Sequence, residues 1–507
     1  MSKIQKRQTI RQSVSYPAGT AFAYKVPEGY FGNLTEEQEA KVRAMWAIGF
    51  KFIEICEADD DVSKEKTLEE KYVPPAKQSR RLPRGASETH EKYPTLVNEI
   101  LSLLPTTEKN LDRLAQQAVE SLDNWTPEMY RLIILRVVKH EHPDALALRF
   151  LRACNWDIIK ATTMMGKTIY WRTIEAGVDE DILRHGEGGA AEDEKNNRGI
   201  TRALGADFMK QARWGKSFIH GVDRAGRPIT HIRVRLHRSS DQSVQSLERY
   251  TLYLLELARL SLRHPIEAGT ILLDLSGFKL ANFDLKPLLF IFKQVETNYP
   301  GSLGLVLVHN APVGLKTIWR LARVWLNKEL TSKVKFTYGK KGLRRWIAPD
   351  QLIRELGGEE DWEYTYVEPE PDENAVMNDT ETRDRLLGER MVLALKFEEL
   401  TKEWVMNAQL SEKAREICDR RNQCVADLAA NYWELDPYVR ARSLYDRLGY
   451  FRGADGVEWY PGKADEESLQ EMMEKIRSID SCGASHHEAV SISDDESRYD
   501  SDLEEMR

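Results

Sequence analysis

The sequence has few cysteines, no long apolar run and no metal-binding spacing. Its 507 residues include five cysteines, Cys56, Cys154, Cys418, Cys424 and Cys482, with neither a Cys-x-x-Cys pair nor a zinc-like spacing of Cys and His. No uncharged stretch reaches the length of about 18 apolar residues that a transmembrane helix needs, and the basic start of the chain has no apolar run behind it. We therefore expect a cytoplasmic protein of a reducing compartment, with no membrane span, no secretion signal, no metal and no cofactor.

Signatures of catalysis and of nucleic-acid binding are also absent from the sequence. The net charge of −8 gives the whole molecule no electrostatic attraction for nucleic acid, so an anionic partner must meet a local patch. The chain has no Gly-x-Ser-x-Gly, Gly-x-Gly-x-x-Gly or His-Glu-x-x-His motif. In "MMGKT" at 164–168, which imitates the end of a phosphate-binding loop, Ala161 replaces a required glycine. We expect no catalytic residue and no enzyme activity.

Three polar side chains that could belong to a site have simpler explanations. Asp274 closes an apolar run, where α/β enzymes often place ligands, but we favour a carboxylate that accepts from the amides of the following turn. His140 and His142 lack partners with the spacing of metal ligands. For both histidines we expect a solvated surface position.

Composition divides the chain into five segments. Apolar residues at helical spacing mark one amphipathic helix at 34–57, and the charged, Pro-containing run that follows has the composition of a linker. The final run is acidic and of low complexity. The predicted order is an N-terminal extension (1–107), a helical unit (108–190), an α/β domain (208–366), a helical C-terminal extension (382–464) and an acidic disordered tail (465–507).

Helix-start residues place the helices of the second segment. Pro143 suits the first position of a helix, and Asp157 is a candidate N-cap for the next one. The compact helical unit is expected to end near Gly177. The Gly-rich and charged "RHGEGGAAEDEKNNRG" at 184–199 then has the composition of a connector.

Short apolar runs alternate with helical patterns in the third segment. The runs at 228–236, 270–275 and 304–310 are rich in β-branched and aliphatic residues, and the stretches at 243–264 and 284–299 have helical spacing. Strands separated by helices imply crossover connections. We therefore predict an α/β fold with a largely parallel sheet that is buried on both faces.

A helix expected at 312–328 combines a wide apolar arc with cationic residues. Packing of one apolar face on the sheet is the simpler explanation of this pattern. However, tryptophans suit a membrane–water boundary, and Arg320 and Arg323 beside the arc suit an anionic membrane. The apolar arc consists of Leu315, Ile318, Trp319, Ala322, Trp325 and Leu326.

Six short motifs follow one another between about residue 120 and residue 366. They are "RFLRACNWD" (149–157), "HGVDRAGRPI" (220–229), "LLDLSGF" (272–278), "NYPGSLGLVLVHNAP" (298–312), "LTSKVKF" (330–336) and "LIRELGG" (352–358). In order and spacing they resemble the CRAL-TRIO family, and within it the fungal phosphatidylinositol/phosphatidylcholine transfer proteins. The resemblance implies a helical CRAL-TRIO N-terminal unit followed by a lipid-binding α/β domain. One lipid would then lie in an apolar cavity under a mobile gate helix at 312–328.

The resemblance also implies positions for contacts with the lipid headgroup. Lys333 matches the family's phosphatidylinositol-binding lysine, whereas Cys154, Gly301 and Leu330 stand where the family has Arg, Glu and Thr. The family's phosphatidylcholine contacts fall on Ile219, Thr230, Gly269 and Ile271. Most of these replacements are small or apolar, so we expect a retained cavity with altered headgroup chemistry.

The function that this resemblance implies is lipid transfer without covalent chemistry. We expect a soluble protein that binds a single phosphatidylinositol-type phospholipid as its ligand and exchanges it peripherally at the anionic surface of intracellular membranes. Two alternatives stay open. The protein could carry a less polar ligand such as a sterol or an isoprenoid, or it could be a membrane-recruited scaffold whose helical region at 382–451 binds a protein partner.

Overall fold

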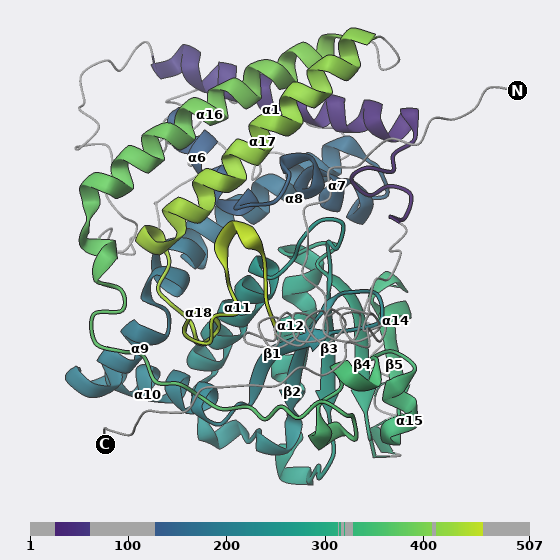
Figure 1. The fold of residues 1–507 in the computed structure, drawn as a ribbon, viewed down its shortest axis with the longest axis vertical. Coiled ribbons are helices and arrows are strands. Elements are labelled where there is room, and N and C mark those ends of the chain that lie inside the picture. The colour runs from purple at the N-terminus through teal and green to yellow at the C-terminus, as the bar shows by residue number, and fades with distance from the viewer. Residues whose placement is uncertain are drawn as a thin grey trace, which may run out of the picture. The chain divides into compact units, whose positions relative to one another are not determined.

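The computed structural model describes residues 26–60, 127–312, 314, 315, 319, 328–407 and 412–459. Within these residues the chain forms a group of helices, here called the helical lobe, and a five-stranded sheet with its own covering helices (Figure 1). The predicted linker beyond residue 60, the tail at 465–507 and most of the predicted gate helix lie outside the described residues. The segment limits given above stay predictions.

The helical lobe is built from α1 (Glu36–Asp60), α6 (Pro127–Val138), α7 (Pro143–Ala153) and α8 (Ile158–Tyr170). Pro143 begins α7, and the Asp157 carboxylate accepts a hydrogen bond from the Lys160 amide at 3.1 Å, so both predicted helix starts are confirmed. Buried apolar side chains from all four helices share one core that includes Val42, Ile133, Leu148, Phe150 and Ala161.

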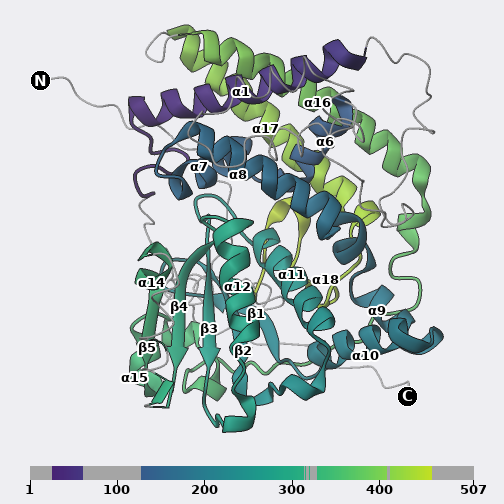
Figure 2. The ribbon, with the colours of Figure 1, turned by 180° about the vertical axis from the view of Figure 1, so that it is seen from behind.

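A hairpin of two long helices packs on this lobe. It consists of α16 (Thr380–Met406) and α17 (Glu412–Val439), which lie beside α1 in both views (Figures 1 and 2). Arg421 forms a bidentate pair with buried Asp144 at 2.9 and 3.0 Å. Arg390 donates to the carbonyls of Leu135 and Lys139 near the end of α6. The inner face of the predicted C-terminal helices is thus covered by this same chain.

The predicted connector at 184–199 is wrong, because most of it is helical. Two short π-helical turns, η2 (Trp171–Glu175) and η3 (Val178–Leu183), lead into α9 (Arg184–Asn196), which packs on α10 (Gly199–Arg213). A Cβ added at Gly205 would lie only 2.6 Å from the carbonyl oxygen of Ala190. The small residues here therefore serve close packing between two helices, which composition alone does not distinguish from a flexible connector.

The sheet has the strand order β1-β2-β3-β4-β5. Its strands are β1 (Ser217–Val222), β2 (Pro228–Arg233), β3 (Gly269–Asp274), β4 (Leu303–His309) and β5 (Val334–Thr337). β1 pairs antiparallel with β2, and every other pair is parallel, which confirms the predicted mostly parallel sheet. The connections are α11 (Val244–Leu260) between β2 and β3 and α12 (Lys286–Thr297) between β3 and β4. Neither β1 nor β5 was predicted as a strand.

Alternate residues of each central strand enter two different cores. Leu272, Leu305 and Leu307 pack with Leu343 and Ile347 near α15 (Gly339–Arg344). On the other face, strand residues such as Leu273 and Val306 pack with apolar side chains of α12. Both faces of the sheet are therefore buried, as parallel pairing requires.

Short elements complete the described fold. Asp274 ends β3 and its carboxylate accepts from the Ser276 amide at 2.9 Å, so the predicted turn-holding role is confirmed. The remaining elements are α14 (Lys328–Lys333), α18 (Leu444–Arg447), η4 (Val234–Leu236), η5 (Ser239–Asp241), η6 (Leu280–Asn282), η8 (Pro349–Gln351), η9 (Arg354–Leu356), η10 (Ala375–Asn378) and η11 (Gly453–Asp455).

Candidate lipid-binding cavity

A cavity of about 230 Å³ lies between one face of the sheet and the helices α11 and α12. In Figure 2 these two helices cross in front of the strands. The strands contribute alternate residues, because the side chains that point to this face recur at every second position. Apolar residues dominate the lining, among them Ile232, Leu247, Leu254, Ile271, Leu273, Leu288, Ile291, Phe292, Val308, Val334 and Phe336.

The spacing of residues on α11 explains why this helix borders the cavity. Leu247, Thr251 and Leu254 stand three or four positions apart, so they share one helix face, and all three line the cavity. The Ser243 hydroxyl caps the helix by accepting from the Ser246 amide at 3.2 Å. Tyr250 also borders the cavity, and its hydroxyl donates to the Ser217 carbonyl at 3.0 Å. This polar atom is therefore satisfied away from the apolar space.

Two residues of the predicted gate helix reach the cavity. Leu315 and Trp319 both line it, and the Trp319 ring packs edge-on against Phe292 and Phe336, with ring centroids 6.3 and 6.4 Å apart. The other predicted gate residues lie outside the described side chains, namely Ile318, Arg320, Ala322, Arg323, Trp325 and Leu326. Movement of this segment and its contact with a membrane stay predictions.

Three predicted contact positions lie side by side across the first three strands. Ile219 pairs with Thr230, and Thr230 pairs with Ile271. Thr230 and Ile271 line the cavity, whereas Ile219 is buried outside the lining and its amide donates to the Tyr445 hydroxyl at 2.7 Å. The amide of Gly269 donates to the Ser302 carbonyl at the start of β3. The roles of these residues as lipid contacts stay predictions.

The four positions implied for a phosphatidylinositol headgroup occupy two places outside the cavity lining. Leu330 and Lys333 lie on α14, where Leu330 is buried and the Lys333 ammonium lies 2.5 Å from the Glu329 carboxylate. Cys154 follows α7, with its sulfur 3.8 Å from that of Met164. Gly301 follows α12 in a left-handed conformation, with a φ of +71°. Headgroup binding at these positions stays a prediction.

Gly301 faces a set of charged residues where the helical lobe meets the sheet. A Cβ at this position would lie 3.2 Å from the Arg149 side chain and 3.5 Å from a terminal nitrogen of Arg152. Arg152 pairs with Glu267 at 2.7 Å and stacks over the Tyr30 ring at 3.7 Å. The N-terminal segment therefore contributes directly to this junction.

Comparison with known proteins assigns the family. Residues 116–167 match the CRAL/TRIO N-terminal domain, and residues 212–358 match the CRAL/TRIO domain. The CRAL-TRIO domain-containing protein C3H8.02 of Schizosaccharomyces pombe is 35% identical over 430 residues, which cover 82% of this chain and 91% of that protein. The chain belongs to the CRAL-TRIO family.

Two further relatives are named as transfer proteins. Phosphatidylinositol transfer protein CSR1 of Eremothecium gossypii is 32% identical over 447 residues, covering 83% of this chain and 98% of that protein. Phosphatidylinositol/phosphatidylcholine transfer protein SFH12 of Arabidopsis thaliana is 26% identical over 245 residues, covering 45% of this chain and 42% of that protein. The matched CRAL/TRIO domain contains the whole sheet and every residue of the cavity lining except Gln211.

Sequence reasoning missed a polar end of the CRAL-TRIO cavity. Gln211, Lys216, His237 and Asp284 all belong to the lining, although they come from three separate stretches of the chain. Burial lowers the pKa of Lys216 to about 8 and also lowers the pKa of His237. The sequence did contain one indication of this site, because Lys216 is a charged residue directly before β1, whose residues are mostly buried.

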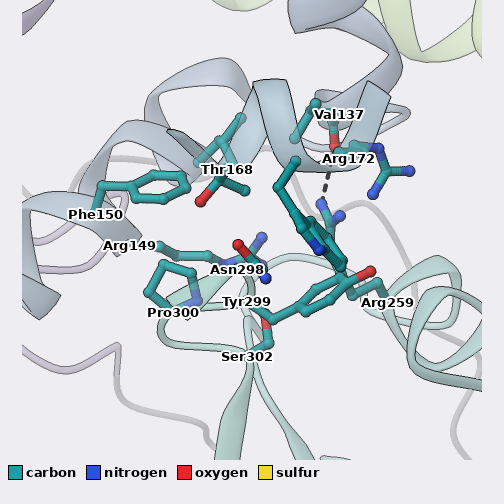
Figure 3. A pocket seen from close by; sticks show the side chains of 12 residues that line it. Val137, Arg149, Phe150, Thr168, Arg172, Arg259, Asn298, Tyr299, Pro300 and Ser302 are labelled. Atoms are coloured by element: carbon teal, nitrogen blue, oxygen red, sulfur yellow. Dashed lines mark hydrogen bonds between the residues drawn. The ribbon is translucent and has the colours of Figure 1, made fainter. Parts of the chain in front are cut away.

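Buried ion pairs join the CRAL-TRIO N-terminal helices to α11. Arg259 of α11 donates to the Val137 carbonyl at 2.9 Å, close to Tyr299 and Arg172 (Figure 3). Burial alone would raise the pKa of Glu256, but Arg172 and Lys139 outweigh it and hold that pKa well below its usual range. The space beside these residues is about 10 Å³, which is room for one water at most. This junction therefore serves to connect the two parts of the molecule.

The solvated positions predicted for His140 and His142 are wrong. Nε2 of His140 lies 2.9 Å from the Leu262 carbonyl oxygen, and the ring packs against Trp433 with centroids 4.9 Å apart. Burial and then Arg263 lower the pKa of His140 to about 3. The ring of His142 stacks on Phe31 at 4.0 Å. Both side chains fill interfaces between segments that are distant in sequence.

The described part of the chain contains no helix that is long and apolar enough to cross a bilayer. Among the same residues, no group of three or more His, Cys, Asp and Glu side chains is arranged to hold a metal ion.

Proposed function

We propose that this protein carries a single phosphatidylinositol-type phospholipid in its apolar cavity and exchanges it at membranes, without covalent chemistry. The observation that carries this proposal is the space of about 230 Å³, lined mainly by aliphatic and aromatic side chains, inside the matched CRAL/TRIO domain. The 32% identity to a protein named for phosphatidylinositol transfer supports the lipid class.

The physics of lipid transport explains the need for such a cavity. Each buried methylene contributes about 0.8 kcal/mol, so an acyl chain of about 16 carbons loses on the order of 12 kcal/mol of favourable free energy when it enters water. A carrier must therefore keep the chain in an apolar space between membranes. Loading requires that this space open at a bilayer surface.

An exposed apolar loop beside the cavity supports peripheral docking on a membrane. Leu280 is 88% exposed and Phe283 is 41% exposed, and Phe283 also lines the cavity. The side-chain amide of Asn282 fixes the loop by donating to the carbonyls of Arg235 and His237 at 3.0 and 2.8 Å. The exposed side chains of Lys279 and Lys286 stand at its two ends. The exposed apolar side chains and the two lysines therefore both favour contact with an anionic bilayer. Here we name residues 279–286 the docking loop.

The free thiols of Cys154, Cys418 and Cys424 are compatible with action in a reducing compartment such as the cytoplasm. We include a cytoplasmic location, peripheral to intracellular membranes, in this proposal. A protein partner bound through 382–451 would have to use the outer faces of α16 and α17, because their inner faces pack within this chain.

A vesicle transfer assay tests this function. Donor vesicles with labelled phosphatidylinositol are mixed with unlabelled acceptor vesicles, and transfer is followed with and without the full chain. We expect the protein to accelerate transfer, and we expect Ile271→Trp, which fills the cavity, to abolish most of that acceleration. Absence of both transfer and bound phospholipid in the unmodified protein would contradict the proposal.

A carrier of a less polar ligand is the second candidate. The observation in its favour is that none of the four positions implied for the phosphatidylinositol headgroup belongs to the cavity lining. Sterol offered from the same donor vesicles distinguishes the two, because a sterol carrier would move sterol faster than phosphatidylinositol.

A further inference from the structure

Lys216 is a buried cation in an otherwise mainly apolar cavity. It is 5% exposed, lines the cavity, and joins the end of α10 to the start of β1. Its ammonium donates to the side-chain oxygen of Gln242 at 2.6 Å. Among the described residues, no carboxylate oxygen lies within the 4.0 Å distance of an ion pair from this ammonium. The ammonium has three N–H donors, and these contacts use only part of them.

Gln211 and Arg233 contact Lys216 through the backbone. The Lys216 amide donates to the Gln211 carbonyl, and the Lys216 carbonyl accepts from the Arg233 amide at 2.9 Å. In the described part of the chain, Oε1 of Gln211 is buried without a hydrogen-bond partner, and Gln211 lines the cavity. The Arg233 guanidinium instead stacks over Phe218 at 4.8 Å, on the enclosed face of the sheet. Polar capacity is thus gathered at one end of the cavity.

A buried ammonium without a direct ion pair is costly, because the carboxylates of Asp241, Asp284 and Asp207 offset only part of its desolvation. Burial accordingly lowers the pKa of Lys216 to about 8. An anionic oxygen brought by a ligand would supply the missing counter-charge and would accept a charge-assisted hydrogen bond. The apolar lining elsewhere would hold the acyl part of the same ligand.

The charges around this end also limit the charge of the ligand. Asp284 lines the cavity and lies 3.3 Å from Nε2 of His237, and Arg233 is already paired with Glu355 at 2.5 Å. A ligand with two negative charges would therefore be repelled by Asp284, and Asp241 and Asp207 near Lys216 add to this repulsion. This arrangement suits a group with a single negative charge, namely a phosphodiester or a carboxylate, better than a phosphomonoester.

We propose that Lys216 binds the singly charged anionic oxygen of a lipid held in the cavity. This inference rests on the proposed lipid-carrying function and assigns the anionic group to a place that the family resemblance did not indicate. One buried lysine thus replaces the missing headgroup contacts.

The test compares Lys216→Met with Lys195→Met, which removes an exposed lysine at the end of α9. Each full-length protein is incubated with phosphatidylcholine vesicles that contain phosphatidylinositol, oleic acid or cholesterol, re-isolated, and analysed for bound lipid. We expect Lys216→Met to lower retention of phosphatidylinositol, oleate or both by at least about tenfold, the scale of one lost charged hydrogen bond. Cholesterol retention should be unchanged, and Lys195→Met should behave like the unmodified protein. Loss confined to phosphatidylinositol identifies a phosphodiester site, and loss confined to oleate identifies a carboxylate site.

Lys216→Gln and Lys216→Arg keep the test decisive if the methionine variant does not fold. The arginine variant should retain anionic lipid better than the glutamine variant. Equal retention of anionic lipid by the glutamine, arginine and unmodified proteins would overturn the inference while leaving the carrier function intact. An unmodified protein that retains none of the three lipids would instead contradict the carrier function itself.

Discussion

The two faces of the central sheet are built from similar residues but have different surroundings. On β3, Leu272 is fully enclosed by side chains from β4 and from the segment around α15, whereas its neighbour Leu273 faces the cavity. Strand geometry puts these adjacent leucines on opposite faces. The enclosed face therefore stabilises the fold, whereas the cavity face leaves room for a ligand.

Shortening one leucine on each face should produce the largest difference. We expect Leu272→Ala to lower the free energy of unfolding by about 2–5 kcal/mol, because it opens a new void in a close-packed core. Leu273→Ala should cost only roughly 1–2 kcal/mol, because it widens a space that already exists. Denaturant unfolding of the lipid-free proteins measures both values. Equal losses would mean that the two faces are packed alike.

The docking loop extends the comparison to the surface beside the cavity face. We expect Leu280→Asp to weaken binding to anionic vesicles by roughly tenfold. The variant lacks the transfer free energy that an exposed leucine gains on entering the bilayer, and the anionic lipids repel its added negative charge. Ile200→Asp is the matched control, since Ile200 is also largely exposed but begins α10. Vesicle co-sedimentation measures binding. Equal weakening by both variants would indicate a nonspecific effect of added charge.

The smallest effect is expected at Lys333, the retained family lysine. Its ammonium is paired with exposed Glu329 on α14 and lies outside the cavity lining. Exposed ion pairs contribute about 0–1 kcal/mol, so Lys333→Met should change phosphatidylinositol retention by less than about threefold. Phosphatidylinositol retention by Lys333→Met and by Lys216→Met is measured in the same assay, so that the two lysines are compared directly. A larger loss at Lys333 than at Lys216 would return the headgroup to the position that the family resemblance implies.

Sequence patterns predicted the central strands and the crossover helices well. β2, β3 and β4 contain runs of β-branched and aliphatic residues, and α11 and α12 have clear helical spacing between them. Burial on both faces leaves a strong signal in such runs. β5 has only four residues, and α9 contains three glycines that favour close packing, so local composition misled us at 184–199.

The candidate site was predictable only in part. The family resemblance pointed to Thr230 and Ile271, and helical spacing pointed to Leu315 and Trp319, all of which line the cavity. Lys216, Gln211 and Gln242 come together only after α10, β1 and the turn before α11 have packed. No local sequence pattern predicts these contacts, because they depend on tertiary structure.

Native mass spectrometry of the purified full-length protein shows whether the cavity holds a lipid. We expect the unmodified protein to carry one lipid molecule per chain, and we expect Ile271→Trp, which fills the cavity face, to be mostly lipid-free while remaining folded. Leu272→Met, a volume-conserving change on the enclosed face, should keep the lipid. A lipid-free unmodified protein, or an equal lipid load in the folded Ile271→Trp variant, would contradict the claim that this cavity holds the ligand.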